Sequence, residues 1–325
     1  MQTIRTLICR PPALGLALLL ALGTAATAAD SPISIDTKPE RGELEIRYKD
    51  HKLLVYAFAT NQFKPYVREL YTLRGENVLR DSPPDHLHHH GMMYACYVNG
   101  TNFWEERGAV GVEKHIALLR HTTGMTTESG PVASFTELVH WVAPTNRTAP
   151  DSLAAALLVE QRTITVTIDE KSGEVALRWE SAFGVGPNAN KVTLHGPNYN
   201  GLGLRLPESF NHAAKFQNSA DQAYVGNNTQ NVIAARWTSV SGLMDGREVM
   251  LAMFGRPDNA RGDGFFFTML DPFAYMSATQ GLDKKPLEYS AGDKFNLSYL
   301  LTVYAEHKSP EFIRQRCELW DKQPK

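Results

Sequence analysis

Cysteine is scarce in this chain, and neither sign of charge is in excess. Three Cys in 325 residues are too few to build a disulfide-rich scaffold. Lys and Arg number 33 against 35 Asp and Glu, which gives a net charge of −2. No basic surplus therefore argues for nucleic acid as a partner. With 43% hydrophobic and 21% charged residues, the composition is that of a folded chain long enough for one large domain or two small ones.

Long apolar runs are missing beyond the N-terminus. Arg5 and Arg10 precede an apolar run over 13–22, and the small residues 26–28 follow it. This order is typical of a secretory signal peptide and predicts cleavage before Ala29. The run is shorter than the roughly 20 apolar residues of a membrane span, although an uncleaved N-terminal anchor is the alternative. We therefore expect a signal peptide at 1–28 and a periplasmic or secreted protein with no membrane span after cleavage.

Helical patterns are few in the rest of the chain, and strand patterns are many. Ser309 and Pro310 offer a cap and a first turn for one helix over 310–320. The strongest hairpin signal joins 164–168 to 175–179 through a Glu-Lys-Ser-Gly turn. An apolar run over 265–270 indicates a strand buried on both faces. Alternating apolar residues predict further strands over 44–48, 53–57 and 295–303.

These patterns together predict an all-β fold. No strand-helix alternation is present, and many short strands with turn signals favour a large antiparallel β-sandwich with few short helices. No Ser/Gly-rich linker divides the chain. We expect a single domain over 29–325, with a short exposed leader at 29–38.

A histidine cluster is the clearest chemical signal. Four of the 11 His fall within the segment Asp85-His86-Leu87-His88-His89-His90-Gly91. Imidazole is neutral near pH 7, so it can accept a proton, donate one or bind a metal. If the segment is extended, His86, His88 and His90 share one face and His89 points the other way. The alternative is a polar surface loop in which the histidines have no chemical role.

A divalent metal is the one cofactor that the sequence suggests. His86 and His88, one residue apart, are candidate ligands of a metal site, and Asp85 could be a ligand or orient an imidazole. The site would need a third ligand from elsewhere, such as His115, His195 or a Glu. The ligand set is therefore incomplete in the sequence.

Several other residues are candidates for binding or catalysis. Glu105 beside Trp104 could be a general base next to an aromatic wall, or one of a pair of solvated acids. Asn200 and Arg205 could hold sugar hydroxyls or a carboxylate, or they could belong to a structural loop in which the Arg pairs locally. The Gly-x-Ser-x-Gly motif of serine hydrolases does not occur in the chain.

The string Asp81-Ser82-Pro83-Pro84 followed by the histidine cluster resembles the hallmark of a family of secreted bacterial domains of unknown function. That family carries the label methane oxygenase PmoA. Weaker matches follow in order over 99–104, 111–115, 201–207, 256–259 and 289–293. Two positions depart from the family pattern: His90 stands where Arg is usual, and the stretch 254–256 lacks an expected His.

The resemblance implies an all-β sandwich, akin to the large sugar-binding supersandwiches of the galactose mutarotase type, and a carbohydrate-related role. It does not imply a membrane methane oxygenase, because such a subunit needs several spanning helices.

We therefore expect a secreted carbohydrate-active protein, an enzyme such as a lyase, hydrolase or epimerase acting on a sugar or an oxidised sugar by histidine acid–base chemistry. The alternatives are a non-catalytic carbohydrate-binding module and a metal-binding accessory protein. The expected catalytic residues are His86, His88, His89, His115 and His195. The expected substrate-binding residues are Asp85, Trp104, Glu105, Asn200, Arg205 and Asn259.

Overall fold

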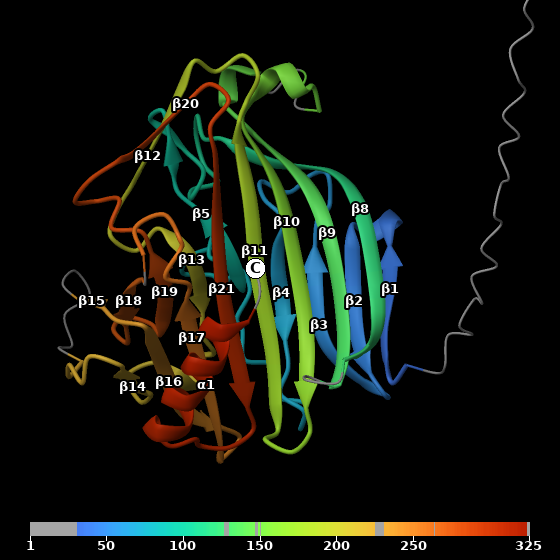
Figure 1. Ribbon diagram of the computed structural model, residues 1–325, viewed down its shortest axis with the longest axis vertical. Coiled ribbons are helices and arrows are strands. Elements are labelled where there is room, and N and C mark those ends of the chain that lie inside the picture. The colour runs from blue at the N-terminus through green and yellow to red at the C-terminus, as the bar shows by residue number, and fades with distance from the viewer. Residues whose placement is uncertain are drawn as a thin grey trace, which may run out of the picture. The chain divides into compact units, whose positions relative to one another are not determined.

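The computed structural model describes residues 31–126, 130–146, 149, 151–224, 231–262 and 264–323. The predicted signal peptide at 1–28 lies outside the described residues. From Ser31 onward the described chain groups into one unit. It holds antiparallel sheets of nine, eight and four strands (Figure 1).

The nine-stranded sheet contains the early strands of the chain and later ones inserted beside them. Its order is β1-β2-β3-β4-β5-β13-β19-β18-β15. The strands predicted over 44–48 and 53–57 are confirmed as β2 and β3, and the run over 265–270 as β18. The bounds are β1 (Ile33–Lys38), β2 (Glu43–Tyr48), β3 (His51–Ala57), β4 (Tyr66–Leu70), β5 (Met92–Ala95), β13 (Gly201–Arg205), β15 (Val232–Ala234), β18 (Phe265–Met269) and β19 (Tyr275–Thr279).

The eight-stranded sheet has the order β14-β16-β17-β21-β11-β10-β9-β8, and its long strands β8 to β11 lie side by side in Figure 1. The predicted hairpin is confirmed, since β10 pairs Ile164 with Trp179 and Ile168 with Val175 of β11. The bounds are β8 (Val112–Thr126), β9 (Gly130–Val142), β10 (Ala156–Asp169), β11 (Glu174–Val185), β14 (Lys215–Asn218), β16 (Trp237–Met244), β17 (Arg247–Gly255) and β21 (Lys294–Tyr304).

The remaining elements are short. The four-stranded sheet contains β6 (Tyr97–Val98), β7 (Thr101–Asn102), β12 (Lys191–His195) and β20 (Leu287–Ser290). Four 3-10 turns occur at η1 (Pro39–Arg41), η2 (Pro144–Asn146), η3 (Leu153–Ala155) and η4 (Glu208–Phe210). The predicted helix is confirmed as α1 (Pro310–Lys322), and the side chain of Ser309 caps it by accepting a hydrogen bond from the backbone N–H of Phe312.

The main core lies between the two large sheets. Leu44 and Ile46 of β2 belong to the same buried cluster as Val166 of β10 and Leu177 of β11. Burial alternates residue by residue along β10, because successive side chains of a strand point to opposite faces. This packing of one sheet against the other confirms the predicted all-β antiparallel sandwich.

The nine-stranded sheet is also covered on its other face. Phe266 of β18 points into the main core, whereas its neighbours Phe267 and Met269 belong to a separate cluster with Tyr275 and Trp104. The expectation that this strand is buried on both faces is therefore confirmed. We call the side that carries the second cluster the outer face of the nine-stranded sheet.

The expected exposed leader at 29–38 is wrong over its second half. Residues 33–38 form β1, which pairs along its whole length with β2, from Ile33 opposite Tyr48 to Lys38 opposite Glu43. Ile33 is buried in the main core and Ile35 packs against it. The alternation in Ile-Ser-Ile-Asp gives β1 one apolar face, which packs against the core at the edge of the nine-stranded sheet.

Two further features concern the lengths of the helices and the cysteines. Among the described residues, no helix is long and apolar enough to cross a bilayer. Cys96 lies in the main core and Cys317 lies in the smaller cluster beneath α1, and no disulfide joins these two residues.

Candidate active site on the outer face

The histidine segment folds as consecutive turns rather than as an extended strand. The backbone N–H of His86 donates to the carbonyl of Pro83 over 2.9 Å, and that of His89 donates to the carbonyl of His86 over 2.9 Å. The N–H of Ser82 closes the loop onto the carbonyl of His89. The expected alternation of faces is therefore wrong, because a turn breaks the period of two.

The consequence is that three imidazoles share one cavity. His86, His88 and His89 line a cavity of about 370 Å³ on the outer face of the nine-stranded sheet. Its size lies within the roughly 300–1,000 Å³ of small-molecule sites. Other side chains that line the cavity are Trp104, Glu105, Tyr199, Phe267, Phe273 and Tyr275.

A buried Arg anchors the histidine loop to the sheet. Arg205, at the end of β13, donates from Nη2 to Oδ2 of Asp85 over 2.7 Å. Its guanidinium lies 3.5 Å from the ring centroid of Phe273, and the whole residue is 1% exposed. Arg205 therefore lies beneath the cavity lining and orients the loop above it.

His89 is the most buried of the three imidazoles. Its Nδ1 lies 3.4 Å from Nη1 of Arg205, and its ring stacks on that of His86 with the centroids 4.5 Å apart. Burial, together with the nearby His88, His86 and Arg205, lowers the pKa of His89 to about 2. His89 is therefore neutral at any physiological pH, which makes it suited to hydrogen bonding and not to carrying a charge.

The other two imidazoles each face a carboxylate. Nδ1 of His86 lies 3.1 Å from Oδ2 of Asp85, and Nδ1 of His88 lies 3.4 Å from Oε2 of Glu105. Burial lowers the pKa of His88, partly against the effect of Glu105, so this imidazole is in its base form at neutral pH. A carboxylate at Nδ1 orients an imidazole so that Nε2 is directed to substrate.

Burial also opposes ionisation of Asp85. The hydrogen bonds from Arg205 and His86 outweigh that effect and lower the pKa of the Asp85 carboxyl to about 2. Asp85 is therefore a carboxylate that links an anchoring Arg to a candidate catalytic His.

His90 points away from the cavity into a second polar network. Its Nδ1 lies 3.0 Å from Oδ1 of Asp81, its Nε2 lies 2.7 Å from Oε1 of Glu106, and its ring stacks on Tyr66. Burial alone lowers the pKa of His90, but the hydrogen bonds to Asp81 and Glu106 outweigh it and raise the pKa. Fully buried Lys64 completes the network by donating to Glu106 over 2.8 Å.

This second network holds the segment after β7 that carries the lining residues Trp104 and Glu105. Lys64 also donates to the carbonyl of Trp104 over 3.2 Å. The side chain of Asn102 accepts from the backbone N–H groups of Trp104 and Glu105, which turns the chain after β7. Nothing in the sequence spacing relates Lys64 to residues some 40 positions later, so sequence analysis missed it.

Two predicted histidines lie outside the cavity lining. His115 of β8 directs Nδ1 to Oε1 of Glu137 at 2.5 Å, and Glu137 also accepts from the hydroxyl of Tyr56. That cluster lies between the large sheets, on the opposite side of the nine-stranded sheet from the cavity. His195 of β12 accepts at Nε2 from the backbone N–H of Gly100 and contacts Tyr97.

Asn200 and Asn259 are both buried and do not line the cavity. Asn259 fixes its loop to β21, donating from Nδ2 to the carbonyl of Ser298 and accepting from the N–H of Ser298 at 2.7 Å. Asn200 follows Tyr199, which lines the cavity, but neither side-chain polar atom of Asn200 has a hydrogen-bond partner among the described residues. The roles predicted for these two residues stay predictions.

The described residues contain no group of three or more His, Cys, Asp or Glu side chains arranged to hold a metal ion. His86 and His88 lie with ring centroids 5.8 Å apart, and the Nδ1 atom of each faces a carboxylate. Metal binding by this pair stays a prediction.

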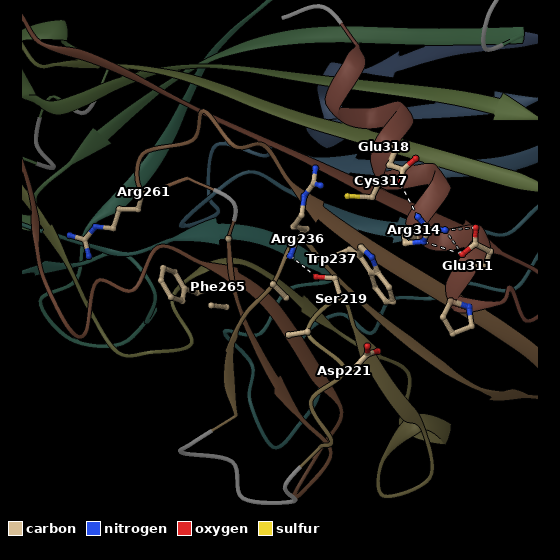
Figure 2. A pocket seen from close by; sticks show the side chains of 15 residues that line it. Ser219, Asp221, Arg236, Trp237, Arg261, Phe265, Glu311, Arg314, Cys317 and Glu318 are labelled. Carbon is tan, nitrogen blue, oxygen red and sulfur yellow. Dashed lines mark hydrogen bonds and ion pairs between the residues drawn. The ribbon is translucent and has the colours of Figure 1, made fainter.

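A larger groove, of about 710 Å³, lies between α1 and the edge formed by β15 and β18 (Figure 2). Three of its charged side chains are engaged with one another, since Arg314 pairs with Glu311 and Glu318. Arg261 donates to the backbone carbonyl of Gly281. No histidine is among its lining residues. The histidine cavity, which is lined by three imidazoles and a carboxylate, is therefore the better candidate for an active site.

Comparison with protein families matches residues 43–318 to the family of unknown function DUF6807. The chain belongs to this family. The match includes the histidine loop, β13 and the Trp104–Glu105 segment, so the whole candidate site lies within the family's domain. A search of curated proteins found no match.

The chain is similar to solved structures, in whole or in part, at low sequence identity. The α-galactosidase AgaB of family GH36 from Geobacillus stearothermophilus is 10% identical with a TM-score of 0.52, covering 84% of this chain and 41% of that one. The chain thus spans about two fifths of the galactosidase. A galactose mutarotase related enzyme from Lactobacillus acidophilus is 9% identical with a TM-score of 0.35, covering 85% of this chain and 100% of that one. The likeness to the galactosidase concerns the fold alone.

Proposed function

We propose that the DUF6807 chain is a carbohydrate-active enzyme that moves a proton on a bound sugar, and that the histidine cavity is its active site. The observation that carries the proposal is the pair of imidazoles, His86 and His88, each with Nδ1 facing a carboxylate inside one aromatic-lined cavity. Groups so arranged are suited to general acid–base catalysis.

The walls of the cavity suit a sugar ring. Tyr199 is partly exposed and offers a flat apolar face against which the C–H face of a pyranose can pack, whereas Trp104 and Phe273 are largely buried parts of the same wall. The imidazoles offer hydrogen-bonding nitrogens. The fold shared with part of an α-galactosidase is compatible with a carbohydrate ligand and does not identify it.

The titratable groups favour proton transfer over hydrolysis by two acids. Glycoside hydrolysis by the common route uses a pair of carboxyl groups across the scissile bond. The cavity lining holds one carboxylate, Glu105, beside three imidazoles. We therefore favour proton abstraction next to the carbonyl of an oxidised sugar, with His88 accepting the proton and returning one after exchange with solvent, so that the sugar is isomerised or epimerised with no net redox change.

Solvent exchange tests this reaction. The protein is incubated in D₂O with a panel of keto sugars and sugar lactones, and deuterium incorporation next to the carbonyl is followed by NMR. We expect incorporation with the wild type and a loss of about 10²-fold or more in His88→Gln. The matched control is His121→Gln, which replaces an exposed imidazole of β8 and is expected to leave the rate unchanged.

Other outcomes would separate the alternatives. Sugar binding without exchange in the wild type would favour a non-catalytic carbohydrate-binding module. One equivalent of a transition metal in untagged wild type, absent from a His86→Ala/His88→Ala double variant, would favour a metal-binding role. Secretion after cleavage before Ala29 remains part of the proposal, and the N-terminal sequence of the mature protein tests it.

A further inference from the structure

The cations nearest to the histidine cavity are not available to a ligand. Arg205 and Lys64 are each 1% exposed. Each is matched by a carboxylate: Arg205 donates to Asp85 over 2.7 Å, and Lys64 donates to Glu106 over 2.8 Å. The ring of Phe273 lies over the Arg205 guanidinium. An acidic group of a bound sugar would therefore meet no Lys or Arg side chain in the lining.

Glu105 is the one acidic side chain in the lining. Its side chain is 40% exposed, and its only ion-pair partner among the described residues is His88, which lies 3.4 Å from Oε2. Oε1 has no hydrogen-bond or ion-pair partner in the part of the chain that is described. Because burial keeps His88 neutral, the negative charge of Glu105 is unbalanced at the cavity wall.

We infer that the cavity selects an amine-bearing sugar over its neutral and acidic counterparts, and that Glu105 makes this selection. The inference rests on the proposed function. A sugar ammonium group can donate to Oε1 while Oε2 continues to face His88. A uronate would instead place a second carboxylate beside Glu105 with no cation between them.

The preference is expected to be moderate, because Glu105 is partly solvated. Ion pairs at such positions change affinity by roughly two- to fivefold. The preference should also weaken as salt is raised, since mobile ions screen a partly exposed pair.

Matched sugars test the inference. Dissociation constants are measured by titration calorimetry for the neutral hexose, the 2-amino-2-deoxyhexose and the uronate in both the gluco and the galacto series, at low and high salt. We expect the amino sugar to bind tightest and the uronate weakest. In Glu105→Gln the three affinities within each series should become equal, because the neutral amide carries no charge that distinguishes an ammonium from a carboxylate.

A matched control is Glu40→Gln, which replaces an exposed acid of η1 outside the cavity and should preserve the order of the wild type. Equal affinities, or tightest binding of the uronate, would overturn the inference while leaving a sugar-binding site in place. An undiminished preference in Glu105→Gln would overturn it as well. Failure of all six sugars to bind, together with no exchange on the carbonyl-bearing panel, would overturn the proposed function and the inference with it.

Discussion

Nη2 of Arg205 donates a 2.7 Å hydrogen bond to Oδ2 of Asp85, 120 residues earlier in the chain. This contact fixes the histidine loop to the end of β13. The same Oδ2 of Asp85 lies 3.1 Å from Nδ1 of His86. One buried cation thus orients a candidate catalytic imidazole without itself lining the cavity.

Asp85→Asn should lower the free energy of unfolding by about 1 kcal/mol, because it removes the charge that matches buried Arg205 but leaves a partly exposed amide that can still accept. Urea unfolding at pH 7 measures the change. The pKa of Asp85 lies at about 2, below its ordinary value, so this contribution is present at neutral pH and is lost as pH falls toward 2. Asp36→Asn, at an exposed acid of β1, is the control and should change little; an equal loss there would contradict the role of Arg205.

The pH dependence of turnover should follow His88. Burial lowers the pKa of this imidazole below its ordinary value of 6.5, and the base form is the active one. Values of kcat/KM should therefore rise with pH along a limb whose midpoint lies below pH 6.5. Glu105 raises the pKa of His88, so Glu105→Gln should move the acid limb to lower pH. A shift to higher pH would show that Glu105 does not act on His88 in this way.

His90 and Glu106 should stabilise the fold most strongly in mildly acidic solution. The pKa of His90 is raised above 6.5, so its contribution is complete below that pH and is lost as pH rises through the folded-state value. The pKa of Glu106 is lowered from 4.5 to about 2, so its contribution is present above pH 4.5 and is lost toward pH 2.

The gap in Tm between the wild type and His90→Gln should therefore be widest between pH 4.5 and 6.5 and should narrow at alkaline pH. Thermal unfolding across that range measures it. His51→Gln, at an exposed position of β3, serves as the comparison and should show no such dependence. A gap that widens with pH would mean that His90 is neutral in the folded protein.

Gly91→Ala should destabilise the protein by about 1–3 kcal/mol, because it forces an overpacked contact. A Cβ at this position would lie 2.6 Å from the carbonyl oxygen of Val67 and 2.7 Å from that of Arg68, both on β4. Backbone atoms of a paired strand cannot move aside as a side chain can. Gly124→Ala on β8 is the matched control, since a Cβ there meets nothing within 4 Å. Chemical unfolding of both variants makes the comparison, and equal stabilities would contradict the close approach.

The sequence by itself determined the strands and the class of the fold. The alternation in the hairpin from Ile164 to Trp179 places one apolar face toward the core, and a slip of one residue would expose that face to water. The Ser309–Pro310 cap likewise determined where α1 begins. Such signals are local, so they can be recognised from neighbouring residues alone. The same alternation was present over 33–38, where the expected leader is instead strand β1.

Only the tertiary structure decided which candidate residues meet. His86, His88 and His89 share a cavity because turns within the loop, and the distant anchor Arg205, place them there. His115 carries the same imidazole but lies between the large sheets beside Glu137, where the register of β8 directs it. The pKa of each histidine depends on burial and on charges brought in from other strands. Residue type therefore indicated which chemistry was possible, whereas long-range packing determined which of the candidate residues line one cavity.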